Sequence, residues 1–309
     1  RADRCRGRCG DALAGNLPPK RGRALVRLVS GGNMEAIELA CRGDCSMSDA
    51  NLDGRRTGKS RLAKSLLYCC GVLMLTPPRS WRKSHNYHHG HVGKLAGSEI
   101  GSFPILTTDA WRKASRLERL RYRISRQPLT IASAYLTVFL VSICLQPMLK
   151  SPRQHWDSAV ALVVHVGLIA ALWWWAGFSV LFFTFLLPFW IAAAMGGYLF
   201  YCQHNFEGMR VLPPEQWSYH RAALESSSYP RLGPVMRWFT GNIGYHHVHH
   251  LNPAIPFYRL PEAMAAIPEL QQPVVTTLRP GDVLASLRLK LWDPEREQMV
   301  GYRQATPSR

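Results

Sequence analysis

Residues 158–202 read SAVALVVHVGLIAALWWWAGFSVLFFTFLLPFWIAAAMGGYLFYC, and this stretch decides the fold. It consists of two uncharged runs, Ser158–Ala176 and Phe178–Cys202, which only Gly177 separates. A helix needs about 20 apolar residues to cross the hydrocarbon core of a bilayer, and both runs meet that length. We therefore predict a transmembrane helical hairpin with Trp173–Trp175 near the interface at its turn. A buried hairpin of a soluble protein is the alternative, which two consecutive runs of this length disfavour.

Two shorter apolar stretches precede the hairpin. Leu66–Leu75 is bounded by Lys64 and by two prolines, and at this length it is better interpreted as an interfacial or partly buried helix than as a span. Leu129–Leu145 carries no charge over about 17 residues, which leaves its relation to the membrane open at this point.

Composition excludes several classes of protein. Among 309 residues, 47% are hydrophobic and 32 are aromatic (11 Phe, 10 Trp and 11 Tyr), which excludes a disordered chain. Eight cysteines in a chain of this length are ordinary usage, which excludes a secreted domain built on disulfides. The formal net charge is +18, but the basic residues flank apolar runs and no nucleic-acid-binding motif is present. We therefore expect anionic lipid headgroups, and no nucleic acid, as the counter-charge.

The charge also predicts an orientation. Residues 79–126 hold 11 Lys and Arg against 3 Asp and Glu. A basic loop next to membrane spans belongs on the cytoplasmic face, so we expect the segments that flank the hairpin there.

The twelve histidines fall in a telling pattern. None precedes residue 85, and the motif H-x-x-H-H occurs twice, as His85, His88, His89 and as His246, His249, His250. On a helix, positions i, i+3 and i+4 share one face, so each motif can aim three imidazoles at one point. Imidazole nitrogen binds iron, zinc and copper, and six convergent imidazoles exceed the needs of one tetrahedral zinc. The count predicts two metal ions.

Other histidines are assigned by position. His204 follows the last apolar run, at the membrane surface where the two motifs must also lie, and we predict that it is a ligand. His91 and His247 are expected in supporting or surface roles. His155, His165 and His220 are expected to be ordinary core or surface residues, and a histidine-rich loop that binds metal adventitiously is the alternative for the motifs.

Parity of crossings constrains the remaining apolar run. Both H-x-x-H-H motifs must lie on one side of the membrane to form one site, so an even number of crossings separates them. The hairpin supplies two. We therefore predict that Leu129–Leu145, bracketed by Pro128 and Pro147, is re-entrant or interfacial.

The sequence resembles the membrane fatty acid desaturases, especially bacterial acyl desaturases of the delta-12/omega-6 group. The matching text is LTPPRSWRKSHNYHH (residues 75–89), QHNFEG (203–208) and WFTGNIGYHHVHHLNPAIPFYRLP (238–261). The resemblance covers roughly residues 60–303. It implies an all-α membrane protein whose cytoplasmic helical cap carries a histidine-rich di-iron site, in the bacterial inner membrane.

The resemblance also implies a chemistry and a ligand set. Two iron ions would activate O2 and remove two hydrogens from an unactivated acyl chain, which leaves a cis double bond and water. Asn242 is a candidate supporting residue for the metal site. The implied iron ligands are His85, His88, His89, His204, His246, His249 and His250.

Metal-binding histidines suit this chemistry, because breaking an alkyl C–H bond needs a metal–oxygen oxidant. The substrate would be an acyl-lipid, an acyl-CoA or an acyl carrier protein. Since no G-x-G-x-x-G fingerprint is present, electrons should come from a ferredoxin or a cytochrome b5-like donor docked on the basic residues 79–126. A fatty acyl or carotenoid hydroxylase on the same scaffold is the alternative.

The N-terminal segment departs from the family. The first histidine box, H-x-x-x-H or H-x-x-x-x-H, should lie near residues 45–55, where this chain has no histidine. We predict an atypical Arg/Gly/Cys-rich segment over 1–57, disordered or foreign to the family, a desaturase-like domain over 58–303 and a tail over 304–309. A truncated, catalytically impaired protein is therefore a further alternative. Two C-x-x-x-C pairs, Cys5–Cys9 and Cys41–Cys45, are expected to be reduced thiols, with a zinc site as the alternative.

Overall fold

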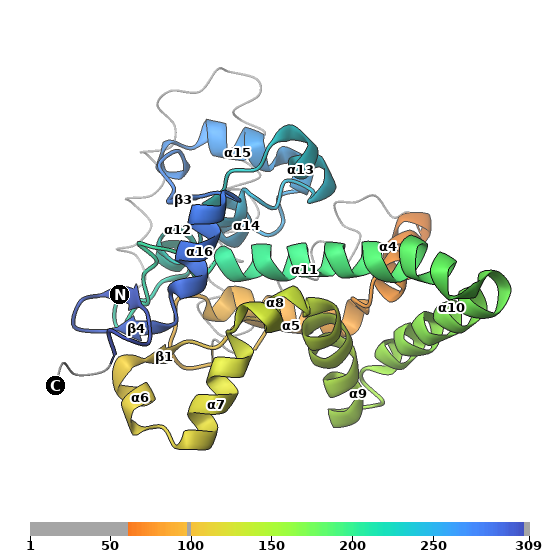
Figure 1. Ribbon diagram of the computed structural model, residues 1–309. Coiled ribbons are helices and arrows are strands. Elements are labelled where there is room, and N and C mark those ends of the chain that lie inside the picture. Colours follow the sequence, from red (N-terminus) through yellow and green to blue (C-terminus); the bar gives the residue numbers. More distant parts are fainter. Residues whose placement is uncertain (1–60, 98–99, 306–309) are drawn as a thin grey trace.

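The computed structural model describes residues 61–97 and 100–305, and these residues are mostly helical (Figure 1). The helices up to Cys202 are α4 (Arg61–Leu73), α5 (Pro78–His91), α6 (Thr108–Lys113), α7 (Arg116–Ser125), α8 (Pro128–Ala132), the π-helix η1 (Tyr135–Leu145), α9 (Gln146–Lys150), α10 (Trp156–Leu181), the π-helix η2 (Phe182–Leu186) and α11 (Leu187–Cys202). The helices that follow are α12 (Tyr219–Glu225), α13 (Pro234–Phe239), α14 (His246–Leu251), the 3-10 helix η3 (Phe257–Arg259), α15 (Leu260–Ala266), the 3-10 helix η4 (Pro268–Leu270) and α16 (Pro280–Arg288).

Two small sheets correct the prediction of an all-α fold. In one, β4 (Leu291–Asp293) pairs in parallel with β1 (Leu106–Thr107) and in antiparallel with β5 (Gln298–Val300). In the other, β2 (Tyr229–Pro230) pairs in parallel with β3 (Val275–Thr276). Strands of two or three residues are too short to leave an alternating hydrophobic pattern, so the sequence does not predict them.

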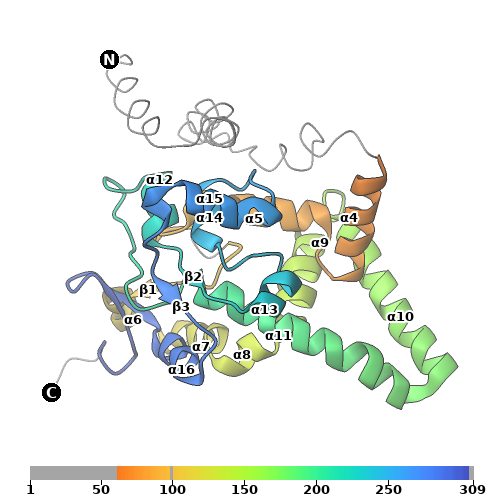
Figure 2. The same ribbon diagram turned by 90° about the horizontal axis from the view of Figure 1, so that it is seen from above.

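The long apolar stretch forms two arms that meet at Gly177. Helix α10 runs outward to this residue, the chain turns, and η2 and α11 run back (Figures 1 and 2). Gly177 has φ 79° and ψ 170°, a conformation that glycine adopts without the steric cost that a Cβ brings. The turn therefore lies at the residue that the sequence predicted.

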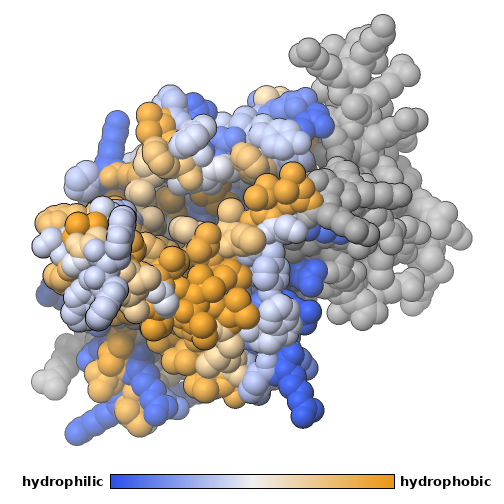
Figure 3. Space-filling model, turned by 90° about the vertical axis from the view of Figure 1, so that its right-hand side faces the viewer, coloured by the Kyte–Doolittle hydropathy of each residue, from blue (hydrophilic) through white to orange (hydrophobic). Residues whose placement is uncertain are grey.

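Among the described residues, Trp156–Cys202 is the one helical stretch long and apolar enough to cross a membrane, judged by length and composition. Its side chains are largely exposed, as at Val163 and Trp174. Apolar side chains gather on the face of the molecule that the hairpin presents (Figure 3). A surface of this kind is typical of contact with lipid.

The run Leu129–Leu145 falls within a series of short helices. The apolar part, Tyr135–Lys150, is shorter than a membrane span. It packs beside the base of the hairpin, where Tyr135 and Cys144 share a buried apolar cluster with Ala161 and Ala193. The length is in line with the predicted non-spanning segment, and its depth in a bilayer stays a prediction. The stretch Leu66–Leu75 lies in α4 and the turn that follows, with Leu66 and Leu67 exposed.

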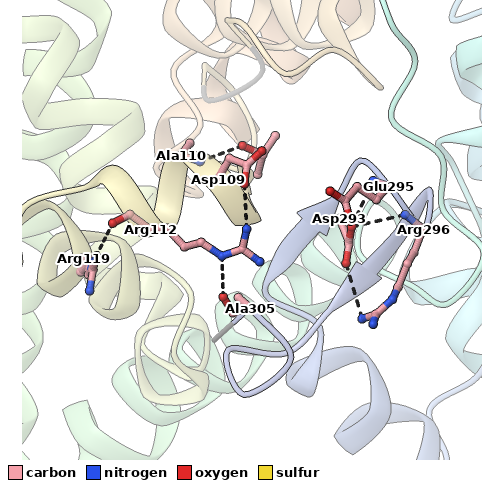
Figure 4. Close-up of polar contacts among 9 residues, drawn as sticks. Asp109, Ala110, Arg112, Arg119, Asp293, Glu295, Arg296 and Ala305 are labelled. Carbon is pink, nitrogen blue, oxygen red and sulfur yellow. Dashed lines mark hydrogen bonds and ion pairs between the residues drawn. The ribbon is translucent and has the colours of Figure 1, made fainter. Parts of the chain in front are cut away.

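The C-terminal residues return to the middle of the chain and close one side of the fold. The guanidinium of Arg112 on α6 donates to the carbonyl of Ala305 at 2.9 Å and pairs with Asp109 at 2.8 Å (Figure 4). Between β4 and β5, the carboxylate of Asp293 accepts the backbone N–H of Glu295 at 3.1 Å. These contacts fix the sheet at the end of the molecule opposite the hairpin turn (Figure 1).

Several predictions lie outside the described residues. They concern the atypical segment 1–57, the cysteine pairs Cys5–Cys9 and Cys41–Cys45, and most of the tail 304–309. The proposed boundaries of the domain remain predictions.

Candidate metal centre

Helix α5 carries the first histidine motif, and its start is fixed by both sequence and packing. Pro78 stands at the first helical position, where its missing N–H costs nothing. The backbone N–H of Arg79 donates to the buried carboxylate of Asp157 at 2.8 Å, and the hydroxyl of Ser80 donates to the carbonyl of Ile143 at 2.7 Å. A carboxylate at a helix N-terminus also interacts favourably with the positive end of the helix dipole. Helix α5 is thus tied to the base of α10 and to η1.

The other predicted ligands lie just after α11 and on α14. His204 lies two residues beyond α11, where Gln203 donates from its side-chain amide to the carbonyl of Ile243 at 3.0 Å. Helix α14 spans only His246–Leu251, and it places His246, His249 and His250 on one face. Segments more than 160 residues apart in sequence therefore meet at one place, as the contact between His85 and His249 illustrates.

The seven predicted histidines form two adjacent clusters. The four-histidine cluster is buried and consists of His88, His204, His246 and His250. The three-histidine cluster, with two of its rings half-buried, consists of His85, His89 and His249.

The Nε2 atoms converge within each cluster. In the three-histidine cluster all three Nε2–Nε2 distances are 3.1 Å. In the four-histidine cluster, the Nε2 atom of His204 lies 3.0 Å from that of His88 and 2.8 Å from that of His246, which is 3.0 Å from that of His250. The rings of His89 and His250, one from each cluster, stack with centroids 4.2 Å apart. The clusters therefore lie side by side.

Burial keeps these imidazoles neutral. The pKa of every ring in the two clusters is lowered, chiefly because burial disfavours the charged form. The pKa falls to about 4 in His85 and His204 and to about 3 in His249. At neutral pH each ring therefore keeps a nitrogen lone pair available to a metal ion.

A model of the family described as fatty acid desaturase matches residues 51–280 of this chain. The chain belongs to the fatty acid desaturase family. A fatty acid desaturase of Bacillus subtilis is 34% identical over 240 residues, which cover 76% of this chain and 67% of that protein. The resemblance found in the sequence is thereby confirmed.

Two cyanobacterial desaturases are more distant relatives. An sn-1 oleoyl-lipid 12-desaturase of Synechocystis sp. is 25% identical over 63% of this chain and 56% of its own length. An sn-1 acyl-lipid omega-3 desaturase (ferredoxin) of Nostoc sp. is 24% identical over 63% of this chain and 55% of its own length. This desaturase-family chain thus spans little more than half the length of either.

The residues fit bound metal ions. Two nitrogens that bind one ion at about 2.1 Å each lie no more than about 4.2 Å apart, and the Nε2 pairs above, at 2.8–3.1 Å, satisfy this condition. A hydrogen bond on the side away from the cluster fixes the orientation of the His204 ring, because its Nδ1 bonds to the carbonyl oxygen of Ser226 at 2.8 Å. A carbonyl can only accept, so Nδ1 carries the proton and Nε2 presents its lone pair to the cluster.

The remaining histidines of this desaturase-family chain lie apart from both clusters. His91 bonds through Nδ1 to the carbonyl of Tyr87, and His247 bonds through Nε2 to the carbonyl of Leu270. His165 bonds to the hydroxyl of Tyr135, and His220 is exposed. His155, although buried, also belongs to neither cluster.

The supporting role predicted for Asn242 stays a prediction, and the structure shows this residue in a turn. It lies in the turn after α13 with φ 57°, and its side-chain amide donates to the carbonyl of Phe257 at 3.1 Å. Asparagine is one of the few residues that tolerate positive φ, so the residue type is explained by the turn.

The residues that hold the histidine-bearing segments in place were not predicted from the sequence. Ser226 acts through its backbone carbonyl, which any residue type offers, so no sequence signal could reveal it. Asp157 leaves only a weak signal, a lone acidic residue just before an apolar run. Asn205 follows His204 directly, and its amide donates to the carbonyl of Ser286 at 2.7 Å, which fastens the end of α11 to α16.

The lowered pKa values predict acid sensitivity of the metal-free desaturase-family chain. Free histidine side chains have a pKa near 6.5, whereas His85, His204 and His249 titrate at about 3 to 4 in the fold. Between these values the unfolded chain binds more protons, so the free energy of unfolding falls as the pH falls from about 6.5 towards 4. Thermal unfolding in detergent at pH 7.5 and pH 5 measures this change. His220→Ala, at an exposed position, should leave it unaltered, and equal midpoints at the two pH values would contradict the prediction.

Proposed function

We propose that this chain is an O2-dependent fatty acyl desaturase that introduces a cis double bond into a lipid acyl chain at a centre of two iron ions. The observation that carries the proposal is the pair of adjacent histidine clusters in a chain of this family. One iron would be held by the four-histidine cluster and the other by the three-histidine cluster. Bound iron would supply the oxidising power that no side chain possesses.

The overall reaction balances without further groups from the protein. The acyl chain loses two hydrogens, and O2 accepts these together with two electrons and two protons to give two molecules of water. The protein's residues hold the ions and exclude water, because the rings of the four-histidine cluster are buried. The carbonyl of Ser226 keeps the proton of His204 on Nδ1, away from the cluster.

A membrane setting follows from the place of the clusters beside the hairpin. The arms 156–176 and 178–202 contain 21 and 25 residues, or about 31 and 37 Å of helix, enough to cross the hydrocarbon core twice. Asp157 at the start of the first arm contacts α5, and His204 follows the end of the second arm, so both motifs lie on one side of the hairpin. The excess of basic residues in 79–126 supports a cytoplasmic location for that side, in a bacterial inner membrane.

The substrate and the electron donor are proposed by analogy. The named relatives include acyl-lipid desaturases, one of them with ferredoxin in its name, which supports a lipid-bound acyl chain and a small iron–sulfur donor. The alternative substrates are an acyl-CoA and an acyl carrier protein. The alternative electron donor is a cytochrome b5-like protein.

A second candidate is a desaturase-type protein with little or no turnover. The three-histidine cluster offers three imidazoles, and the sequence has no histidine before residue 85. Among the described residues, the Nδ1 atoms of His89, His246 and His250 make no hydrogen bond, although metal-bound imidazoles usually donate this proton.

Product analysis tests the proposed function. The chain is expressed with a ferredoxin reducing system in a host that lacks the product, and the lipids are analysed by gas chromatography. We expect a new cis-monounsaturated or more unsaturated acyl chain, which His88→Ala abolishes because it removes a ring from the four-histidine cluster. His220→Ala, at an exposed position outside both clusters, should give the same product as the unchanged chain. A new hydroxyl group would favour the hydroxylase alternative. Zero or one bound iron per chain, together with no product, would favour the second candidate.

A further inference from the structure

Aromatic side chains gather on the surface near the second histidine motif. Trp238 and Phe239 at the end of α13 are 78% and 70% exposed, and Phe257 and Tyr258 of η3 are also exposed. We call these four residues the aromatic patch. Leaving so much aromatic area in water is unfavourable, because removal of apolar surface from water stabilises a protein or a complex.

The two halves of the patch are held side by side. The side-chain amide of Asn242 donates to the carbonyl of Phe257 at 3.1 Å. Gly241 precedes it with φ 57°, and a Cβ at this glycine would lie 3.5 Å from the ring of Phe257. The turn after α13 therefore rests against η3, and the four rings belong to one fixed surface.

The inner face of α13 fixes the depth of the patch relative to the hairpin. Met236 on α13 and Ile243 after it pack against the last turns of α11, where Met195, Leu199 and Cys202 lie. Met195 and Cys202 are about 10 Å apart along a helix axis. Figure 2 shows α13 alongside this end of α11. The patch thus lies level with the end of the second arm, where an apolar helix leaves the hydrocarbon and enters the headgroup layer.

Basic residues outnumber acidic residues around the patch. Residues 231–259 contain three arginines and no aspartate or glutamate. Arg259 is paired with Glu262 at 3.0 Å, whereas Arg231 is exposed and Arg237 is half-buried. Basic residues beside exposed aromatic rings favour a layer of anionic headgroups over an aqueous surface.

We propose that the aromatic patch, with Arg231 and Arg237, lies in the headgroup layer of an anionic bilayer and forms a second membrane contact besides the hairpin. This inference rests on the proposed function, which places the hairpin in a membrane. Since α14 begins seven residues after Phe239, the contact holds the second histidine motif against the lipid surface from which the acyl chain is taken.

Photo-crosslinking tests the inference. The full chain, with p-benzoylphenylalanine in place of Trp238, is reconstituted in vesicles of phosphatidylcholine and phosphatidylglycerol and irradiated, and lipid adducts are measured by mass spectrometry. Two exposed positions serve as controls in the same way, Val163 on the first arm of the hairpin and Glu295 in the β4–β5 turn. Because all three side chains are exposed, the substitutions leave the core intact.

We expect lipid adducts at positions 238 and 163 and at least about tenfold fewer at position 295, since only the first two lie in the bilayer. Adducts at 163 together with a yield at 238 as low as that at 295 would overturn the inference and leave the proposed function standing. A lack of adducts at 163 would overturn the membrane setting and the inference with it. Crosslinking of position 238 to an added ferredoxin, in place of lipid, would identify the patch as a protein interface and would also overturn the inference.

Discussion

His246→Ala is expected to lower the iron bound per chain from about two to about one and to abolish desaturation. The Nε2 atom of His246 lies 2.8 Å from that of His204 and 3.0 Å from that of His250, within the four-histidine cluster. Loss of a residue that merely supports a ligand costs about 10–100-fold in metal affinity or activity, so loss of a ligand should cost more than about a hundredfold. Iron is measured by elemental analysis of the purified chain, and activity by the acyl product.

His247→Ala is the matched control for this variant. His247 is the next residue on α14 and is equally buried, but its Nε2 bonds to the carbonyl of Leu270 and belongs to neither cluster. Both variants remove a buried imidazole from one helix, so both should lower the melting temperature to a similar degree. Only His246→Ala should lose iron. If the two variants lost equal amounts of iron, the loss would reflect unfolding of α14, and the ligand assignment would be wrong.

The histidine motifs made the site predictable because their information is local. A spacing of three and four residues aims rings from one helix in one direction, and the two copies needed only to meet. All seven predicted residues do come together, including His204, which was placed by its position at the end of an apolar run. The turn at Gly177 was predictable for the same reason, since a single glycine interrupts two runs of adequate length.

What the sequence could not predict depends on contacts between distant segments. The pairing of β1 with β4 joins Leu106 to Leu291, and neither strand is long enough to show a period. The carbonyl of Ser226 that orients His204 has no residue preference. The partition of the seven histidines into four and three also follows from the packing of α5 against α11 and α14, because His88 and His89 are neighbours in sequence but belong to different clusters.

Arg126 is another such contact, and it leads to the largest expected effect on stability. This arginine is 1% exposed at the end of α7, and among the described residues it forms no ion pair with a carboxylate. Its guanidinium donates to the carbonyl of Pro104 at 2.6 Å, to the side-chain oxygen of Asn205, and to the hydroxyl of Tyr201 at 3.3 Å. It therefore joins α7 to the end of α11, one residue from the predicted ligand His204.

Arg126→Met removes the donor from three oxygens, of which those of Asn205 and Tyr201 are buried. It is expected to lower the free energy of unfolding by about 3 kcal/mol, because a buried oxygen that loses its donor costs about 1–3 kcal/mol. Methionine nearly fills the space, so the loss measures hydrogen bonds more than a cavity. At about 2–4 °C per kcal/mol, the melting temperature in detergent should fall by about 10 °C. Arg121→Ala, at an exposed position on the same helix, should change the melting temperature by little.

The Arg126 variant should also affect the metal site. Since Asn205 also donates to the carbonyl of Ser286, the loss of Arg126 should loosen the end of α11 and lower iron occupancy in the four-histidine cluster. An unchanged melting temperature would mean that the desolvation penalty of the buried charge equals the stabilisation from its hydrogen bonds. The contact would then have no net role in holding His204 in place.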